Sequence, residues 1–250
     1  MLELKGVSFE VNDENGREEI LRDINLSMGD RRFIVITGPN GGGKSTLAKL
    51  LIGVERPTAG RIYFDGEDIT ELSITERARK GIAIAFQQPV KFKGIQVLDL
   101  LRIAAGRNLS ASEGCDFLSE VGLCARDYIG REVNSSLSGG ELKRIEIATV
   151  IARRARFSVF DEPEAGIDLW SFQNLIRVFE KMRRDITDST ILVISHQERI
   201  LKIADEIIVI KDGVVERHGD KKDVLPEILG TESAVDACIA FKRREAENNA

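Results

Sequence analysis

The nine residues Gly38-Pro39-Asn40-Gly41-Gly42-Gly43-Lys44-Ser45-Thr46 constrain the fold of this chain more than any other stretch. They fit the pattern G-x-x-x-x-G-K-[ST] and stand between an apolar β-branched run at 33–37 and a helix-favouring run at 47–52. In this context the glycines let backbone N–H groups turn toward phosphate oxygens, and the helix adds its positive end. We therefore expect these residues to bind a nucleotide, with Lys44 reaching the β- and γ-phosphates and the Ser45 hydroxyl binding Mg²⁺. The alternative is a glycine-rich turn without a ligand.

Composition narrows the class of protein. The chain has 250 residues, enough for one large domain or one domain with an inserted lobe, and its net charge of −5 argues against free nucleic acid as a partner. Its three cysteines, Cys115, Cys124 and Cys238, form no C-x-x-C pair, which favours reduced thiols in a cytoplasm over a zinc or cluster site. No apolar run approaches the ~20 residues that span a bilayer, and the start lacks the apolar core of a signal peptide. We expect a cytoplasmic protein without direct membrane insertion.

The hydrophobic pattern changes along the chain. Residues 95–155 have helical periodicity, whereas short apolar runs typical of strands dominate on both sides. The spacing predicts helices at 75–80, 141–154 and 169–184, and strands at 2–9, 20–28, 33–37, 61–65, 82–86, 157–160, 190–194, 206–210 and 214–217. We therefore predict a single α/β domain whose core comprises 1–94, with an N-terminal antiparallel β subdomain, and 156–230. Residues 95–155 form an inserted α-helical subdomain, and 231–250 a C-terminal tail.

Two adjacent carboxylates, Asp161 and Glu162, follow the apolar run 157–160. Ligands of open parallel sheets bind at the carboxyl ends of strands. Because successive strand residues point to opposite sides, we expect Asp161 to face the Mg²⁺ ion and Glu162 to face the attacking water. A solvated strand end is the alternative for this pair.

A second glycine motif, Leu137-Ser138-Gly139-Gly140-Glu141, repeats the physics of the phosphate loop. It combines a hydroxyl, two glycines with exposed N–H groups and a helix N-terminus. One ATP needs only one such cradle, so we expect Ser138, Gly139 and Gly140 to complete the ATP site of a second copy of the chain. Ser138 is also a good helix N-cap, although capping alone does not explain two consecutive glycines.

In this order of motifs the sequence resembles the ATP-binding cassette (ABC) ATPases. The resemblance runs from Leu2 to about Leu229 and adds Gln87 after the run 82–86, Ala165-Gly-Ile-Asp168, and Ser195-His196. It implies a P-loop NTPase fold with a mixed parallel sheet, and two copies that pack head to tail around two ATPs. It further implies that Gln87 helps to bind Mg²⁺ and senses the γ-phosphate, that Glu162 polarises the water, and that His196 contacts the γ-phosphate. Asp168 would cross the dimer interface. His218 matches no family motif and is expected to be structural.

One position departs from the family pattern. ABC proteins usually stack the adenine on an aromatic residue shortly after the first strand, and alignment puts Val11 there. Phe9 is near, but strand alternation turns it to the other side. Valine gives up part of the stacking energy, about 1 kcal/mol. We therefore predict weak discrimination between ATP and GTP.

Two local segments resemble the SufC-type ATPases of iron–sulfur cluster assembly. They are Phe86-Gln-Gln-Pro-Val90 with Gly94, and Ser195-His-Gln-Glu-Arg-Ile-Leu201. Trp170 departs from that type, which usually has Asp there, and we expect this tryptophan to pack in the core.

The resemblance implies a partner, a SufB/SufD-like scaffold protein, that docks near residues 87–101. The segment Lys91-Phe92-Lys93 offers it an aromatic anchor flanked by cations, or else is a solvated loop. The alternative function is the nucleotide-binding subunit of an ABC membrane transporter. ABC proteins of DNA repair and the cohesin type are disfavoured, because they carry coiled coils or zinc modules that this sequence lacks.

Overall fold

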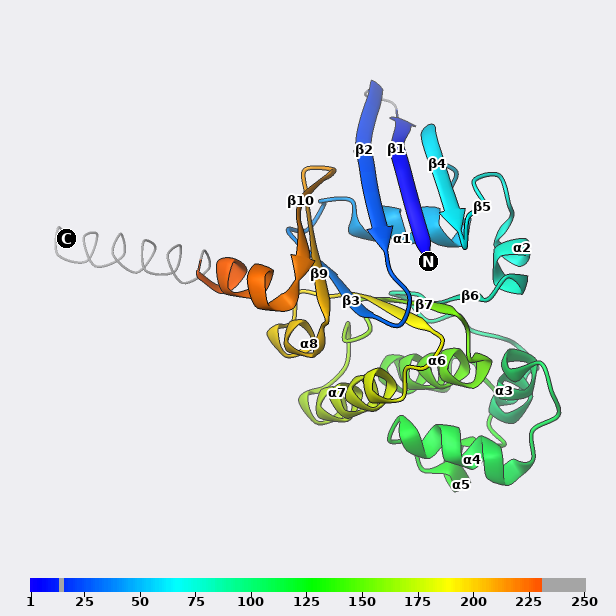
Figure 1. Ribbon diagram of the computed structural model, residues 1–250. Helices are drawn as coiled ribbons and strands as arrows, with labels where there is room; N and C mark the ends of the chain where they lie inside the picture. The colour runs from blue at the N-terminus through cyan, green and yellow to red at the C-terminus, as the bar shows by residue number, and fades with distance from the viewer. Residues whose placement is uncertain (14–15, 231–250) are drawn as a thin grey trace, which may run out of the picture.

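The computed structural model describes residues 1–13 and 16–230, which form two β-sheets and the helices around them (Figure 1). An antiparallel sheet has the order β2-β1-β4-β5, and a six-stranded sheet has the order β10-β9-β3-β8-β7-β6. The first comprises β1 (Leu2–Asp13), β2 (Gly16–Met28), β4 (Ala59–Phe64) and β5 (Glu67–Asp68). The second comprises β3 (Phe33–Thr37), β6 (Ile82–Ala85), β7 (Phe157–Asp161), β8 (Thr190–Ile194), β9 (Glu206–Lys211) and β10 (Val214–Asp220). Five of its strands are parallel, and β10 pairs antiparallel to β9.

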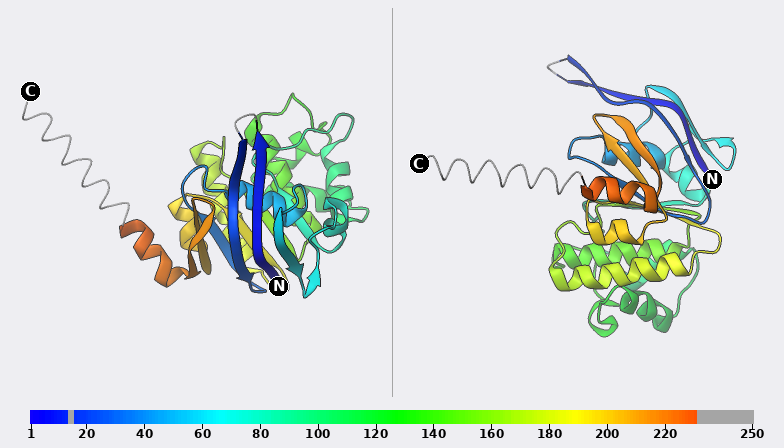
Figure 2. Two further views of the ribbon diagram at one scale, coloured as in Figure 1. Left: turned by 90° about the horizontal axis from the view of Figure 1, so that it is seen from above. Right: turned by 60° about the vertical axis from the view of Figure 1, so that its left-hand side comes forward.

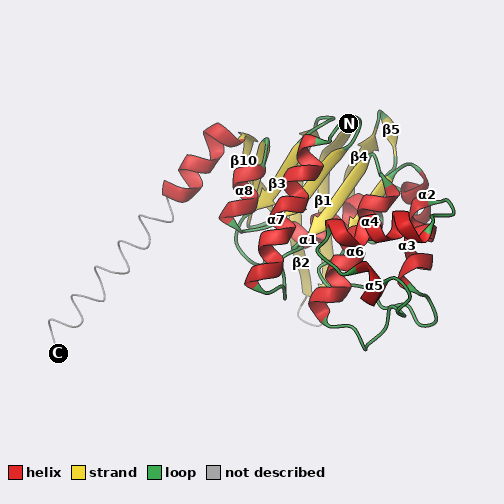
Figure 3. Ribbon diagram, turned by 90° about the horizontal axis from the view of Figure 1, so that it is seen from below, coloured by secondary structure: helices red, strands yellow, loops and turns green. Residues whose placement is uncertain are grey.

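The helices cover the six-stranded sheet on both faces. They are α1 (Lys44–Ile52), α2 (Ile74–Arg79), α3 (Val97–Ala105), α4 (Ala111–Glu120), α5 (Ala125–Tyr128), α6 (Gly139–Arg153), α7 (Leu169–Arg184) and α8 (Glu198–Ile203), and residues 221–230 are also helical. Helix α1 lies between the two sheets, whereas α6 and α7 cover the opposite face (Figures 1 and 3). The right-hand view of Figure 2 shows these layers from the side. No helix in residues 1–13 and 16–230 is long and apolar enough to cross a membrane.

Strand β3 is the centre of the core because every one of its side chains is buried. Phe33 and Val35 pack toward α6 and α7, and Ile34 and Ile36 pack toward α1 and the antiparallel sheet. This alternation is what a strand buried on both faces requires, and it places the phosphate loop after Thr37 at the carboxyl edge of the sheet.

Arg77 joins α2 to the rear of α1. Its side chain is 0% exposed, and it donates to the carbonyl oxygens of Leu50 (2.5 Å), Leu51 (3.0 Å), Thr70 (2.8 Å) and Leu72 (3.1 Å). The last carbonyls of a helix lack intrahelical partners, and Arg77 supplies them for α1. Burial lowers the pKa of Arg77 to about 10.

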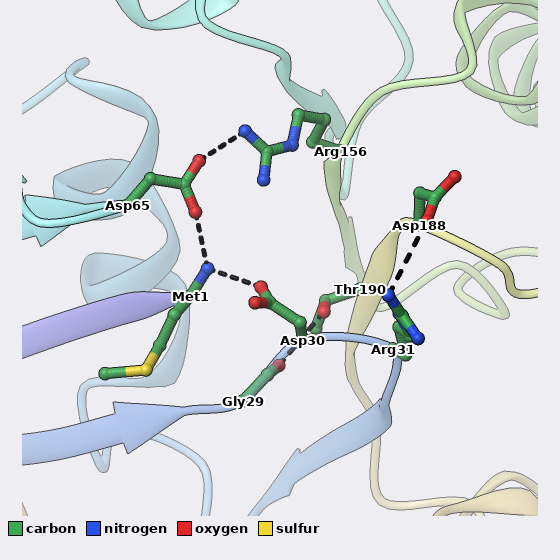
Figure 4. A network of polar contacts seen from close by, with 8 residues as sticks. All are labelled: Met1, Gly29, Asp30, Arg31, Asp65, Arg156, Asp188 and Thr190. Carbon is green, nitrogen blue, oxygen red and sulfur yellow. Dashed lines mark hydrogen bonds and ion pairs between the residues drawn. The ribbon is translucent and has the colours of Figure 1, made fainter.

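A polar network joins the two sheets at the edge opposite the phosphate loop (Figure 4). The Met1 amino group contacts Asp30 and lies 2.7 Å from Asp65, whose other oxygen lies 2.5 Å from Arg156. The Thr190 hydroxyl donates to the Gly29 carbonyl at 3.0 Å. Asp65 directly follows β4 and Arg156 directly precedes β7, so the network ties β4 to the start of the parallel strands.

The structure confirms the predicted fold class and changes some element boundaries. Strands β1 and β2 extend further into the polar stretch, where Asn12 pairs with Arg17 and Asp13 with Gly16. Hairpin pairing satisfies their backbone groups even though the residues are turn formers. The short elements β5, α5 and α8 and the helix at 221–230 were not predicted. Trp170 is 82% exposed, so its expected place in the core is wrong. The tail 231–250, with Cys238, lies outside the described residues.

Candidate functional site

The phosphate-loop residues form a tight turn between β3 and α1. Gly38 has φ 133° and Gly43 has φ 97°, and a Cβ on Gly38 would lie 1.9 Å from the carbonyl oxygen of Ile210. These positions need glycine because the backbone is left-handed or approaches a neighbouring strand closely. The loop also holds Asn40, Gly41 and Gly42, with the Gly42 N–H donating to the Pro39 carbonyl at 3.2 Å.

Lys44 folds back over its own loop. Its Nζ donates to the carbonyl oxygens of Gly38 (2.8 Å) and Pro39 (2.7 Å), and the side chain is 6% exposed. Burial lowers the pKa of Lys44, while Glu162 and Asp161 oppose the shift. A cation held over a glycine cradle, with only weak carbonyl partners, is suited to exchange them for phosphate oxygens.

Ser45 and Asp161 meet across the sheet edge. The Ser45 hydroxyl donates to Asp161 Oδ1 at 3.1 Å, and Asp161 is 6% exposed at the end of β7. Burial raises the pKa of Asp161, and the hydrogen bond from Ser45 opposes that shift. A hydroxyl beside a carboxylate is a donor set that Mg²⁺ accepts, since this ion takes one or two carboxylates and completes its shell with phosphates and water. Within residues 1–13 and 16–230, no three His, Cys, Asp or Glu side chains form a ready-made metal cluster.

Glu162 and Gln87 lie next to each other beside this pair. Gln87 Nε2 donates to Glu162 Oε2 at 2.5 Å. Strand alternation does not set the direction of Glu162, because β7 ends at Asp161 and Glu162 has φ 42°. The expectation that strand alternation directs Glu162 is therefore wrong. Its backbone is left-handed, and its N–H donates to the Ile194 carbonyl at 3.0 Å. A non-glycine residue in this region is strained, which is common at functional sites.

A buried ion pair on α6 grips the segment that carries Gln87. Lys143, 1% exposed, donates to the carbonyls of Phe86 and Gln87, the latter at 3.1 Å, and lies 3.9 Å from Glu146. Glu146 accepts the Phe86 N–H at 3.0 Å, and burial raises its pKa to about 7. Burial also lowers the pKa of Lys143. The sequence reasoning missed this pair, although Lys143 and Glu146 stand at i, i+3 on one helix, which was its visible signal.

Residues 1–13 and 16–230 contain three serine–glutamate capping boxes, and the one at Ser138 has an additional partner, Tyr128. Ser73, Ser110 and Ser138 each accept an N–H from the glutamate three residues on, at the start of α2, α4 and α6. The first two hydroxyls also donate to that glutamate, at 2.7 Å and 2.9 Å. Glu141 also accepts from the Tyr128 hydroxyl, besides the Ser138 N–H. The hydrogen bonds from Tyr128 and from the N–H and hydroxyl of Ser138 lower the pKa of Glu141.

His196 is exposed just past the end of β8, and its nearest polar partner is Gln197, 3.3 Å away between side-chain nitrogens. The residue before it is fixed: the buried Ser195 hydroxyl donates to Glu164 Oε1 at 2.5 Å and accepts the Gln197 N–H at 3.0 Å. Burial raises the pKa of Glu164. Sequence reasoning missed Glu164, because nothing in its local pattern marks a buried carboxylate.

The site residues fall into two groups. The phosphate loop with Thr46, Asp161, Glu162, Gln87 and His196 lies along the carboxyl edge of the parallel strands. Ser138, Gly139 and Gly140 make no hydrogen bond to residues 38–46 within the described chain. Asp168 caps α7 by accepting the N–H groups of Trp170 and Ser171, both at 3.0 Å.

The structure also places the residues of four other predictions, which concern the adenine-stacking position, the docking segment, His218 and the cysteines. Val11 is 42% exposed, whereas Phe9 packs against the core between the sheets. Phe92 is half-buried against the helical core, with its N–H on the Val133 carbonyl at 2.8 Å, so it does not serve as an exposed anchor. The His218 ring contacts Glu206 across β9 and β10, as a structural role requires. The described cysteines, Cys115 and Cys124, are free thiols.

Comparison with known proteins places the chain in a family. Residues 21–165 match the family of the ABC transporter. An uncharacterised ABC transporter ATP-binding protein of Methanocaldococcus jannaschii is 39% identical, over 84% of this chain and 86% of that protein. The probable ATP-dependent transporter ycf16 of Cyanidium caldarium is 31% identical, over 81% and 85%. The dimeric structure of MJ0796, a bacterial ABC transporter cassette, shares the fold with a TM-score of 0.79 at 24% identity, over 88% of this chain and 99% of the other. The chain therefore belongs to the ATP-binding proteins of the ABC transporter family.

Proposed function

We propose that this chain binds ATP with Mg²⁺ on residues 38–46 and hydrolyses it to ADP and phosphate within a dimer of two copies. The observation that carries the proposal is the convergence of two contacts at the mouth of the phosphate loop. These are Ser45 on Asp161 at 3.1 Å and Gln87 on Glu162 at 2.5 Å. Together they place the Ser45 hydroxyl, the Asp161 carboxylate and the Gln87 amide where a Mg²⁺–phosphate group would bind. The Glu162 carboxylate lies beside them.

Binding requires an exchange of partners by Lys44. Its ammonium group leaves the carbonyls of Gly38 and Pro39 for phosphate oxygens, while the loop N–H groups and the start of α1 hold the remaining oxygens. Ser45, Asp161 and Gln87 would hold Mg²⁺, which neutralises charge on the phosphates when bound.

Hydrolysis requires a polarised water in line with the γ-phosphate. Glu162 is the candidate base, and it has to exchange the Gln87 amide for the water proton. His196 follows β8 at the same edge, and its exposed imidazole is free to donate to the phosphate oxygens, where charge develops.

The second copy is proposed because residues 138–140 combine a hydroxyl and two glycine N–H groups at the start of α6 and make no hydrogen bond to the phosphate loop of their own chain. Ser138, Gly139 and Gly140 would donate to the γ-phosphate of the ATP bound by the other copy. Asp168, which precedes α7 at the same edge, would lie at that interface.

Glu162→Gln tests the base. Turnover should fall about 10²–10⁴-fold, ATP binding should persist, and a dimer that retains ATP should accumulate in gel filtration. Glu180→Gln, on the exposed face of α7, is the matched control and should turn over at the wild-type rate. Normal turnover by Glu162→Gln would remove Glu162 from the catalytic role.

Ser138→Ala and Ser110→Ala form a matched pair for the role of the second motif. Both variants lose an N-cap and should lose about 1 kcal/mol of stability. Only Ser138→Ala should lose turnover, and it should bind ATP normally as a monomer. Equal turnover in the two variants would reduce Ser138 to a helix cap.

We further propose a cytoplasmic protein whose ATP-driven dimerisation moves a partner of the SufB/SufD scaffold type, on the resemblance of residues 86–94 and 195–201 to SufC-type ATPases. The alternative, the nucleotide-binding subunit of a membrane transporter, is supported by the names of its relatives. Purification of the tagged chain separates them. A soluble β-rich partner supports the scaffold, and a multi-span membrane protein supports the transporter.

A further inference from the structure

A pocket of about 780 Å³ opens at the edge of the parallel sheet opposite the phosphate loop. It lies where β7 and β8 begin, between the carboxyl-terminal halves of α6 and α7, and Phe117 and Glu120 of α4 form one wall. Because parallel strands begin at one edge and end at the other, this pocket is separated from the nucleotide site by the length of the strands. Neither the family assignment nor the proposed ATPase cycle uses it.

The floor of the pocket is apolar. Val150, Val178 and Ile191 are at most 6% exposed, and the half-buried side chains of Ile151 and Met182 extend this surface. The volume lies within the range of about 300–1,000 Å³ that holds small organic ligands.

The rim of the pocket is cationic, although the whole chain carries a net charge of −5. Five of the lining residues are basic and three are acidic. Two acids are already neutralised, since Glu120 pairs with Lys181 and Asp188 lies 3.9 Å from Arg31. Figure 4 shows Arg156 turned toward Asp65 and Asp188 facing Arg31.

Three guanidinium groups remain. The side chains of Arg154, Arg177 and Arg184 line the pocket and make no hydrogen bond or ion pair with any residue of the described chain. Against them stands one carboxylate without a side-chain partner there, Asp185. Cations in the last turn of a helix also stabilise the helix dipole, which accounts for Arg184. It does not account for Arg177, which lies two turns before the end of α7.

Arg154 provides a separate argument. It ends α6 with φ 50° and ψ 46°, a left-handed conformation that normally favours glycine at this position. An arginine there costs stability that glycine would not, so the geometry of the helix end does not by itself explain this residue.

We propose that this pocket binds a small organic anion, an acidic group on an apolar body, with Arg154 and Arg177 holding the acid. The apolar body lies on Val150, Val178 and Ile191. A carboxylate and a phosphate are both planar or multidentate acceptors that suit a guanidinium fork, so the experiment has to separate them.

The probe is 8-anilinonaphthalene-1-sulfonate, an anion on an aromatic body, titrated by fluorescence into the full chain with saturating ADP to fill the phosphate loop. Arg177→Glu should weaken probe binding by about 10-fold or more, because a charged hydrogen bond is replaced by repulsion. Arg126→Glu, the same charge change on exposed α5, should leave it unchanged. Competition with octanoate and with phenyl phosphate assigns the acid: displacement by one identifies a carboxylate or a phosphate, and displacement by neither contradicts the proposal.

Arg154→Gly guards against misfolding as an explanation. It relieves the left-handed backbone, so the variant should be at least as stable as the wild type while it binds the probe several-fold more weakly. Wild-type probe affinity in both Arg154→Gly and Arg177→Glu would overturn the proposal, as would a failure of the wild type to bind the probe once saturating ADP is present.

Discussion

Replacement of Lys143 by methionine should destabilise the protein by an amount that depends on pH. At pH 6 Glu146 is largely protonated, since its pKa is about 7, so the loss is that of the charged hydrogen bonds to the Phe86 and Gln87 carbonyls. Two such bonds are together worth about 3 kcal/mol.

The penalty should be larger at pH 8. Lys143 lowers the pKa of Glu146, so without Lys143 the carboxyl stays protonated to higher pH in the folded variant. Because the folded pKa of Glu146 is raised, stability falls as pH rises from the unfolded pKa toward 7, and in the wild type this loss ends once Glu146 ionises in both states. In the variant the carboxyl keeps its proton above pH 7, so the folded state goes on losing stability. At one pH unit above the wild-type pKa this difference is about 1.4 kcal/mol. The expected loss is therefore about 3 kcal/mol at pH 6 and more than 4 kcal/mol at pH 8.

Urea unfolding at the two pH values measures this difference. Far-ultraviolet circular dichroism is the suitable signal, because the only tryptophan, Trp170, is 82% exposed already in the folded chain. Lys202→Met is the matched control: that lysine is exposed and pairs with Glu198 on α8, so its loss should cost about 0.5 kcal/mol or less at both values. A Lys143→Met penalty that equals this control, or that does not change with pH, would refute the reasoning.

Three further predictions concern other contacts. Arg77→Met should lower the free energy of unfolding in urea by about 3–5 kcal/mol, because four carbonyls lose a buried donor. The exposed Arg79→Met is the control and should lower it little. Similar values for the two variants would show that Arg77 is dispensable. Val11→Tyr should tighten ATP binding by about 1 kcal/mol, roughly fivefold, in calorimetric titration if the base stacks there. The wild type should distinguish ATP from GTP only weakly. A hundredfold preference of the wild type for ATP would contradict this reasoning. Glu164→Ala should lower turnover about tenfold with unchanged ATP affinity, because Ser195 and thus His196 lose their support; an affinity loss without a turnover loss would assign Glu164 to binding instead.

Those parts of the site that depend on residues adjacent in the sequence could be predicted. The phosphate loop is visible in the sequence because its glycines, Lys44 and Ser45 follow one another between a strand and a helix. The steric need for Gly38 and Gly43 is set by Ile210 and Leu21, which only the fold brings close. Helix α7 begins at Leu169 and ends at Arg184, as predicted, because Asp168 caps it and its apolar residues are regular.

Burial of charged groups could not be predicted in the same way. Arg77, Lys143, Glu146 and Glu164 are residue types usually found at the surface, and only long-range packing encloses them. The same limit explains why Phe92 is half-buried and Trp170 exposed, the opposite of what was expected for each. Phe92 stands in a loop without periodicity, and contacts with distant residues decide which way it faces. Trp170 stands in the first turn of α7, where it is 82% exposed.

The position of β3 in its sheet has a consequence for the order in which the protein is made. This early strand pairs with β8 on one side and β9 on the other, at the register Ile34 to Leu192 and Ile34 to Glu206. The phosphate loop leaves the ribosome before β8 and β9. Its supporting strand β3 therefore has no neighbour in the sheet until about 150 more residues, those up to β8, have been synthesised. Residues 38–46 are therefore made long before they can be held in shape. ATP cannot select the folded form of a nascent chain until nearly all the described residues have emerged.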